Sequence, residues 1–162
     1  MDVIALLTAE HDELARLFDE LERDATPESL LRLTVLVKTH ARTEEKVLYE
    51  VLRTTELRSF ALEGPYEHEI FEVVIDRLAG QRATDELHAI LRVARDLFEH
   101  HARDEEEGSV FPHLEQLVGS TQRATLGHDL ILERERITPA IERATSPRDV
   151  IPVRRLHAHK WH

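Results

Sequence analysis

Apolar residues recur along most of the chain at alternating steps of three and four, which is the spacing of one face of an α-helix. Between residues 2 and 22, this face consists of Ile4, Leu7, His11, Leu14, Phe18 and Leu21. Thr26 and Pro27 suit the N-cap and the first position of a second helix, which is predicted to run to about Thr54. Its face consists of Leu30, Leu33, Val37, His40, Glu44, Val47 or Leu48, and Val51.

Two further helices are predicted in the middle of the chain. Gly64-Pro65 is expected to break the chain and open a third helix, which Gly80 ends. The face of this third helix consists of His68, Phe71, Ile75 and Leu78. Thr84 is the expected N-cap of a fourth helix. The face of this fourth helix consists of Leu87, Leu91, Ala94, Phe98, His101 and Glu105.

The fourth helix should be disturbed at its end by Gly108 and Pro112, and a fifth helical segment is predicted from about Ser120 to Ala144, with a kink or an end at Pro139. No alternating pattern predicts a strand. Short connections favour antiparallel neighbours. The expected fold is all-α, an up-down-up-down four-helix bundle over residues 1–118, with an additional C-terminal helical segment over 119–145 packed on the bundle and an irregular tail over 146–162.

Composition narrows the possible functions. The 162 residues are enough for one domain with a core, and the absence of cysteine excludes disulfides and thiolate metal sites. A formal net charge of −11 disfavours nucleic acid as a partner. The N-terminus does not have the pattern of a signal peptide, and no apolar run is long enough to span a bilayer. We therefore expect a cytoplasmic protein with no membrane partner.

Polar residues interrupt the apolar faces of four helices, and a buried carboxylate without a partner is costly. They are His11, His40, Glu44, His68, His101 and Glu105. Histidine and glutamate four residues apart lie on one helical face, so the second and fourth helices can each offer a nitrogen and an oxygen to the same point. Glu45 and Glu106 lie beside these faces and are expected to be solvated or to support a ligand.

This combination predicts a metal site with six ligands, which is too many for one tetrahedral zinc ion. Six ligands suit two ions bridged by the two carboxylates, and nitrogen and oxygen donors without sulfur favour iron or manganese, although zinc would also bind. The pairing within the last helix stays open. His100 with Glu105, or His101 with Glu106, would also present two ligands.

The pattern resembles the hemerythrin-like domain, also called the HHE cation-binding domain, over roughly residues 4 to 117. Glu10-His11 and Glu67-His68 match its first and third helices. The segments after His40 and His101 match its second and fourth helices, so that one half appears twice. The resemblance implies a four-helix bundle and, as cofactor, two Fe ions in an oxo-bridged diiron centre with two bridging carboxylates.

Two departures from the oxygen-carrying hemerythrins matter. They have a second histidine four residues after the one on the third helix, where this chain has Glu72, so the resemblance is closer to the four-histidine branch. The segment after His101 is also one residue longer than the segment after His40, which suggests an insertion or bulge near Gly108.

Three functions remain open from the sequence. The preferred one is a non-haem diiron protein that reacts with peroxide or oxygen in a redox or iron-stress role, which includes possible catalase-like turnover. The second is a module that senses or binds oxygen, nitric oxide or iron without turnover. The third is a metal-free helical interaction domain. A ferritin-like diiron protein is disfavoured because the chain lacks any Glu-x-x-His motif.

Overall fold

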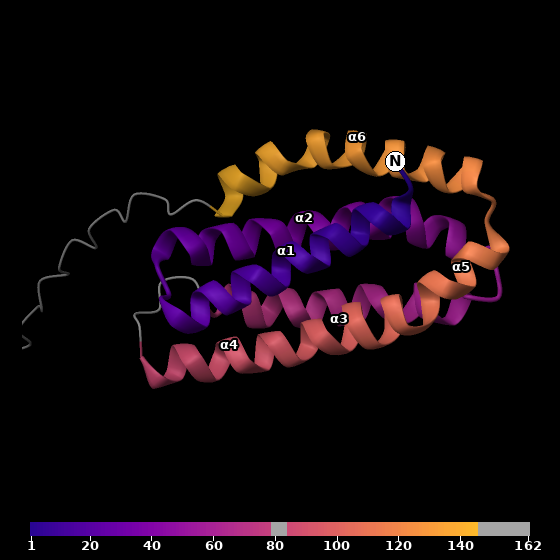
Figure 1. The fold of residues 1–162 in the computed structure, drawn as a ribbon. Helices are drawn as coiled ribbons and strands as arrows, with labels where there is room; N and C mark the ends of the chain where they lie inside the picture. Colours follow the sequence, from indigo (N-terminus) through magenta and orange to yellow (C-terminus); the bar gives the residue numbers. More distant parts are fainter. Residues whose placement is uncertain (79–83, 146–162) are drawn as a thin grey trace, which may run out of the picture.

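The protein is described by a computed structural model covering residues 1–78 and 84–145. Its first four long elements run antiparallel to one another and form a bundle (Figure 1). In chain order the helices are α1 (Val3–Arg23), α2 (Pro27–Leu52), α3 (Arg58–Asp76), α4 (Asp85–Phe98), the π-helix η1 (Glu99–Val110), α5 (Phe111–Leu117) and α6 (Ser120–Thr145). The all-α bundle with an additional C-terminal helix is confirmed.

The predicted helix starts are confirmed where capping residues define them. The Thr26 hydroxyl accepts from the Ser29 amide, and Pro27 opens α2. The Thr84 hydroxyl accepts from the Leu87 amide and caps α4. The predicted end of the third helix at Gly80 lies outside the described residues, as does the tail from residue 146.

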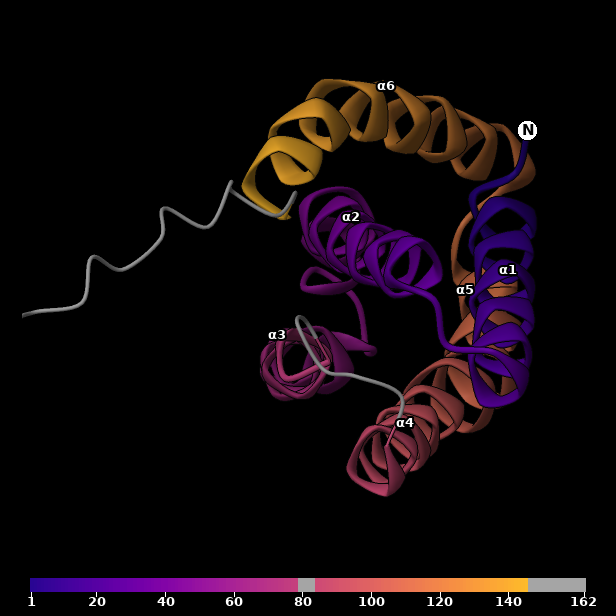
Figure 2. The ribbon, with the colours of Figure 1, turned by 90° about the vertical axis from the view of Figure 1, so that its left-hand side faces the viewer.

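The predicted helix break at Gly64-Pro65 is wrong. α3 begins at Arg58 and continues through Gly64 and Pro65. Gly64 serves a close approach instead, because a Cβ there would lie 2.6 Å from the Tyr49 hydroxyl. Of the kink or end predicted at Pro139, the end does not occur, because α6 continues through this residue, and α6 curves over the bundle (Figure 2).

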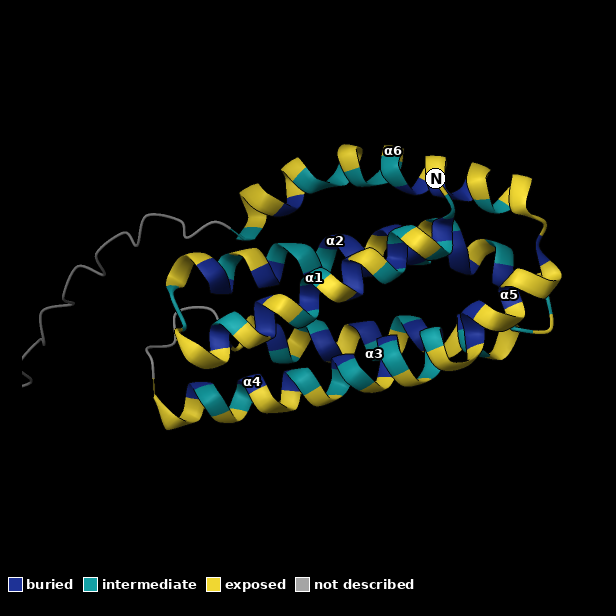
Figure 3. Cartoon of the chain, viewed as in Figure 1, coloured by how far each residue is buried: buried dark blue, intermediate teal, exposed yellow. Residues whose placement is uncertain are grey.

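α6 packs along α1 and α2 and leaves the α3 and α4 side of the bundle uncovered (Figure 2). The helix comes so close to the N-terminus that a Cβ on Gly127 would collide with the Met1 carbonyl. Burial follows the inward faces of the helices, with exposed residues on the outside (Figure 3). None of the helices within the described ranges is both long and apolar enough to cross a membrane.

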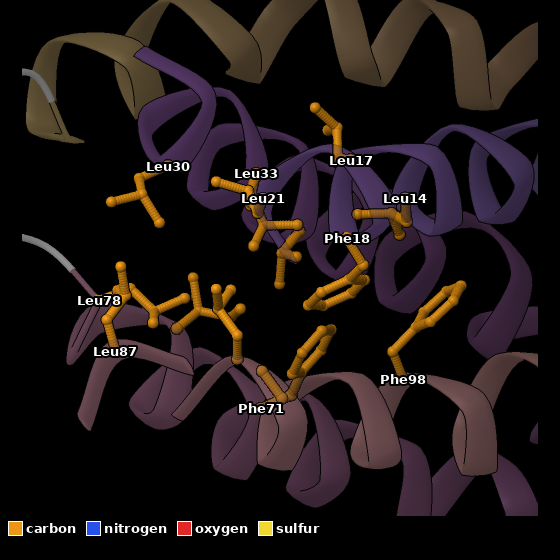
Figure 4. Packing of buried hydrophobic residues seen from close by; sticks show 14 of the residues in the cluster. Leu14, Leu17, Phe18, Leu21, Leu30, Leu33, Phe71, Leu78, Leu87 and Phe98 are labelled. Atoms are coloured by element: carbon orange, nitrogen blue, oxygen red, sulfur yellow. The ribbon is translucent and has the colours of Figure 1, made fainter. Parts of the chain in front are cut away.

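The interior has two apolar clusters with a polar layer between them. One cluster, shown in Figure 4, contains Leu14, Phe18, Phe71 and Phe98 among others. The other contains Leu7, Leu48, Tyr49 and Phe111 among others. On α1 the two clusters are separated by His11, which lies between Leu7 and Leu14. Apolar packing on both sides therefore fixes the height at which the polar side chains meet.

Candidate metal centre

Four histidines meet in the polar layer, one from each of α1, α2, α3 and η1. They are His11, His40, His68 and His101, and each is at most 7% exposed. Their rings are neighbours: the ring centroids of His11 and His40 are 5.0 Å apart, and those of His68 and His101 are 4.7 Å apart. The structure thus brings together the four histidines that the sequence singled out.

Glu44 of α2 is fully buried beside two of these rings. Its Oε2 lies 3.6 Å from Nε2 of His40 and 3.5 Å from Nε2 of His68. The spacing of four residues between His40 and Glu44 places both on the inner face of α2, as the sequence predicted. A carboxylate from one helix therefore faces imidazoles from two helices.

Glu106 of η1 occupies the corresponding place on the other side, and it is also fully buried. Its Oε2 lies 3.3 Å from Nε2 of His11, and its Oε1 lies 3.6 Å from Nε2 of His101. Each of the four histidine Nε2 atoms thus faces one of two buried carboxylates.

Glu105, the residue proposed from the sequence, does not join this layer. Its side chain is 31% exposed and lies 3.5 Å from Nε2 of the outward-facing His100. The reason is local: η1 has the wider turn of a π-helix, in which the Phe111 amide bonds to the Glu106 carbonyl five residues earlier. Residues five apart then share a face, so His101 pairs with Glu106, one of the pairings left open by the sequence.

Each histidine also has a carboxylate at its other ring nitrogen. The hydrogen bonds join Nδ1 of His11 to Glu107 (2.8 Å), of His40 to Glu10 (2.9 Å), of His68 to Glu45 (2.8 Å) and of His101 to Glu67 (2.6 Å). A carboxylate accepts, so Nδ1 carries the proton, and whenever such a ring is neutral its lone pair is on Nε2. This arrangement orients histidine ligands in many metal sites.

The supporting carboxylates follow the internal duplication. Glu10 and Glu67 each precede a histidine on the first helix of a half, and each bonds to the histidine on the second helix of the same half. Glu45 and Glu107 each follow a buried glutamate and bond to the first-helix histidine of the other half. The repeated Glu-His and Glu-Glu dipeptides therefore encode the four supports and four of the six inner residues, and His40 and His101 complete the set.

The pKa values of the two buried carboxylates are shifted in opposite directions. Burial and the nearby Glu106 raise the pKa of Glu44 well above its ordinary value. Burial also acts to raise the pKa of Glu106, but His101 and His11 outweigh it and lower that pKa to about 2. Burial lowers the pKa of His40 to about 3, so its ring is neutral. Without a cation, two adjacent carboxylates cannot both be charged cheaply.

A metal ion would satisfy atoms that have no other partner. Among the described residues, both oxygens of Glu44, Oε2 of Glu106 and Nε2 of His11 are buried without a hydrogen-bond partner. Unpaired buried polar atoms are uncommon in folded proteins and call for an explanation. Inward-facing carboxylate oxygens and an imidazole nitrogen are ligand atoms for iron, manganese or zinc, so the donor set fits a metal.

The inner residues divide into two sets of three, each with two imidazoles and one carboxylate. Donor group 1 is His11, His40 and Glu106, and donor group 2 is Glu44, His68 and His101. Within each group, one ligand atom from each residue lies within 4.8 Å of the others. The three residues of each group suit one metal ion that keeps further coordination positions open for other ligands.

Tyr49 brings a hydroxyl to the junction of the two groups. It is fully buried, donates to Oε1 of Glu106 at 3.3 Å and lies 3.3 Å from Nε2 of His101. Its ring stacks on His68 at 5.7 Å. Burial raises the pKa of Tyr49 well above its ordinary value, so the phenol keeps its proton.

Glu72, where the oxygen carriers have a histidine, points away from the centre. Its Oε2 accepts from Nη2 of Arg42 at 3.2 Å on the surface of the bundle. It therefore adds no donor to group 2.

A cavity of about 210 Å³ borders the centre on the side that α6 leaves uncovered. Its lining consists of Glu67, His68, Ile70, Phe71, Leu97, His100 and His101. His68 and His101 belong to donor group 2, whereas the side chain of His100 is 62% exposed. The cavity therefore borders two residues of group 2.

Comparison with known sequences agrees with this geometry. The sequence model of the hemerythrin HHE cation binding domain matches residues 2–108, about two thirds of the chain. Searches of curated proteins and of solved structures gave no significant match. The matched region contains every residue of both donor groups and ends before α6.

Proposed function

The chain belongs to the hemerythrin HHE cation-binding family, and from this premise we propose that it is a non-haem diiron protein. Donor groups 1 and 2 would each hold one iron ion. The observation that carries the proposal is the convergence of four imidazole Nε2 atoms on two fully buried carboxylates that have unpartnered oxygens. A helix-packing domain without a metal would gain nothing from that arrangement.

Iron is favoured by the donors. Both groups offer nitrogen and oxygen without sulfur, and both are open beyond three protein ligands. A pair of iron ions supplies one-electron and two-electron chemistry towards oxygen or peroxide. The protein supplies orientation, through the four supporting carboxylates, and the exclusion of bulk water by the apolar clusters.

We propose that the reaction is with peroxide or oxygen, in a redox or iron-stress role. The cavity at donor group 2 admits a small ligand. Burial keeps the Tyr49 hydroxyl protonated at the junction of the two groups, and it can donate a hydrogen bond to a ligand there. Because Glu72 is turned towards Arg42, no further side chain fills group 2.

Peroxide turnover tests this proposal. Iron-loaded protein is expected to convert two molecules of hydrogen peroxide into two of water and one of oxygen faster than the same concentration of free iron. Tyr49→Phe should slow this release, because the hydroxyl near the junction is lost. Tyr66→Phe is the matched control, since Tyr66 is 70% exposed on α3.

The second candidate is a module that senses or binds oxygen, nitric oxide or iron without turnover. It is favoured by the same cavity, which needs only to admit the ligand. Reversible oxygen binding over many cycles without consumption of peroxide would support it and contradict the catalytic proposal. The cytoplasmic location and the absence of a nucleic-acid partner, both expected from the sequence, stay predictions.

A further inference from the structure

α6 contributes no residue to either donor group and lies beyond the region that matches the family, yet one of its side chains reaches the polar layer. Arg134 projects from the middle of α6 and forms an ion pair with Glu10 of α1 through Nη2 and Oε1. Its side chain is 29% exposed, as α6 lies along α1 and α2 (Figure 2). This contact is the most direct link between α6 and the centre.

Glu10 joins that ion pair to donor group 1. While Oε1 faces Arg134, Oε2 accepts the hydrogen bond from Nδ1 of His40 at 2.9 Å. The Nε2 of the same imidazole points to the inner carboxylates, 3.6 Å from Glu44. A continuous chain of guanidinium, carboxylate and imidazole therefore runs from α6 to an inner ligand atom.

Burial explains why Glu10 needs a cation. The residue is 7% exposed, and a buried carboxylate is costly unless it is paired and hydrogen-bonded. Glu67, its counterpart in the second half, supports His101 with a side chain that is 32% exposed. In the described part of the chain no arginine pairs with Glu67, and water can solvate it. Of these two counterpart glutamates, Glu10 beneath α6 thus has an arginine partner and Glu67 does not.

We propose that Arg134 is a positioning residue of the metal centre, which holds Glu10 in place so that Glu10 fixes the ring of His40. This inference rests on the proposed binding of metal by donor groups 1 and 2. If Arg134 has this role, the docking of α6 on the bundle and the binding of metal are thermodynamically coupled. Coupling of this kind is reciprocal: if Arg134 strengthens metal binding, then bound metal strengthens the docking of α6.

The first test compares metal affinity in three variants by anaerobic competition for ferrous iron with a chelator. Arg134→Leu is expected to weaken the binding of one of the two ions by about tenfold, at the lower end of the effect of residues that support ligands. Arg134→Lys should restore part of the affinity. Arg136→Leu is the matched control, because Arg136 is 69% exposed and pairs with Glu133 within α6.

The second test uses amide hydrogen exchange of the metal-free and iron-loaded proteins. In the wild type, iron should slow exchange in α6 around Arg134 as well as in α3, which carries a ligand but makes few contacts with α6. In Arg134→Leu, iron should slow exchange in α3 alone. With Glu10→Gln as the background, Arg134→Leu should weaken iron binding no further, because residue 10 has lost the carboxylate that links Arg134 to His40.

The outcomes separate the inference from the function on which it rests. If iron neither binds nor protects α3 in the wild type, the proposed function fails. If iron binds and protects α3, but Arg134→Leu leaves both iron affinity and the protection of α6 unchanged, the role of Arg134 is overturned. Equal loss of affinity in Arg134→Leu and Arg136→Leu would also overturn it.

Discussion

Donor groups 1 and 2 each consist of two histidines and one glutamate, but their surroundings differ. Behind group 1, Glu107 accepts from Arg103 at 2.6 Å, and Glu10 pairs with Arg134. Behind group 2, the side chains of Glu45 and Glu67 are 34% and 32% exposed, and no described arginine pairs with them. Group 1 lies on the side covered by α6, while group 2 borders the cavity.

The difference shows that an internal duplication can supply two similar ion sites without making them equivalent. Ligand type is set by the repeated dipeptides, and it is the same in both halves. The charge and the solvent access behind the ligands are set by contacts that differ between the halves. Arg103 pairs with Glu107, whereas Arg42, at the matching place in α2, pairs with Glu72, and Arg134 comes from α6, outside both halves. We therefore expect group 1 to retain its ion and group 2 to exchange its ion and admit ligands.

The largest effect is expected from removing the inner carboxylate of η1. Glu106→Gln takes the only carboxylate from donor group 1 and leaves Glu44 to serve both ions, so iron content should fall from two ions per chain to one or fewer. Glu105→Gln, one position away on the exposed side, should keep two ions. The measurement is elemental analysis of both variants after identical loading. If Glu105→Gln lost more iron than Glu106→Gln, Glu105 would be the metal ligand instead of Glu106.

Removal of the metal should destabilise the whole bundle. Without cations, Glu44 and Glu106 repel each other in the buried layer. Each ion at about a hundredfold above its dissociation constant stabilises by about 2.7 kcal/mol, so loss of even one ion should lower the melting temperature by about 5 to 10 °C.

Thermal unfolding followed by circular dichroism measures this gap, and Glu44→Ala should narrow it because one repulsive partner is gone. Identical melting of the metal-free and loaded proteins would contradict a centre shared by both halves.

Release of metal should occur in two phases if the two groups differ as described. A chelator should remove the ion of group 2 first, since the cavity reaches His68 and His101. Glu67→Gln should accelerate the fast phase, and Glu107→Gln should accelerate the slow one, each by about tenfold or more. Stopped-flow absorbance resolves the phases. A single phase that both substitutions accelerate alike would show that the groups are equivalent.

The smallest effect is expected at Glu72. Glu72→His removes the contact with Arg42 and places an imidazole one helical turn after His68. If that ring turns inward, group 2 gains a nitrogen donor, so oxygen should stay bound longer and peroxide turnover should slow modestly. Glu72→Gln controls for the lost ion pair. Equal peroxide turnover and oxygen retention in both variants would show that this position does not influence the centre.

The sequence predicted most of the fold and most of the inner residues because both follow helical periodicity. It failed where backbone geometry departs from the regular α-helix. Glu105 was proposed since it lies four residues after His101, but the π-turn selects Glu106. The one-residue length difference between the two halves was the available signal, and it left both pairings open.

Contacts between distant segments could not be predicted from periodicity. Glu10, Glu45 and Glu67 lie beside the apolar faces, where a glutamate is ordinarily solvated, and only the packing of neighbouring helices turns them towards histidines. Arg134 is likewise one of many charged residues on α6 until the helix is laid along α1 and α2. Gly64 indicated a helix break, yet it makes room for the Tyr49 ring.

The number of iron ions bound per chain shows directly whether donor groups 1 and 2 form a dinuclear centre. Metal-free protein would be loaded with ferrous iron without oxygen, desalted, and analysed for iron and protein in the same sample. The two donor groups predict two iron ions per chain, and the count should fall in Glu44→Ala and Glu106→Gln while Glu105→Gln retains two. One ion or fewer in the wild type after loading would contradict a dinuclear centre.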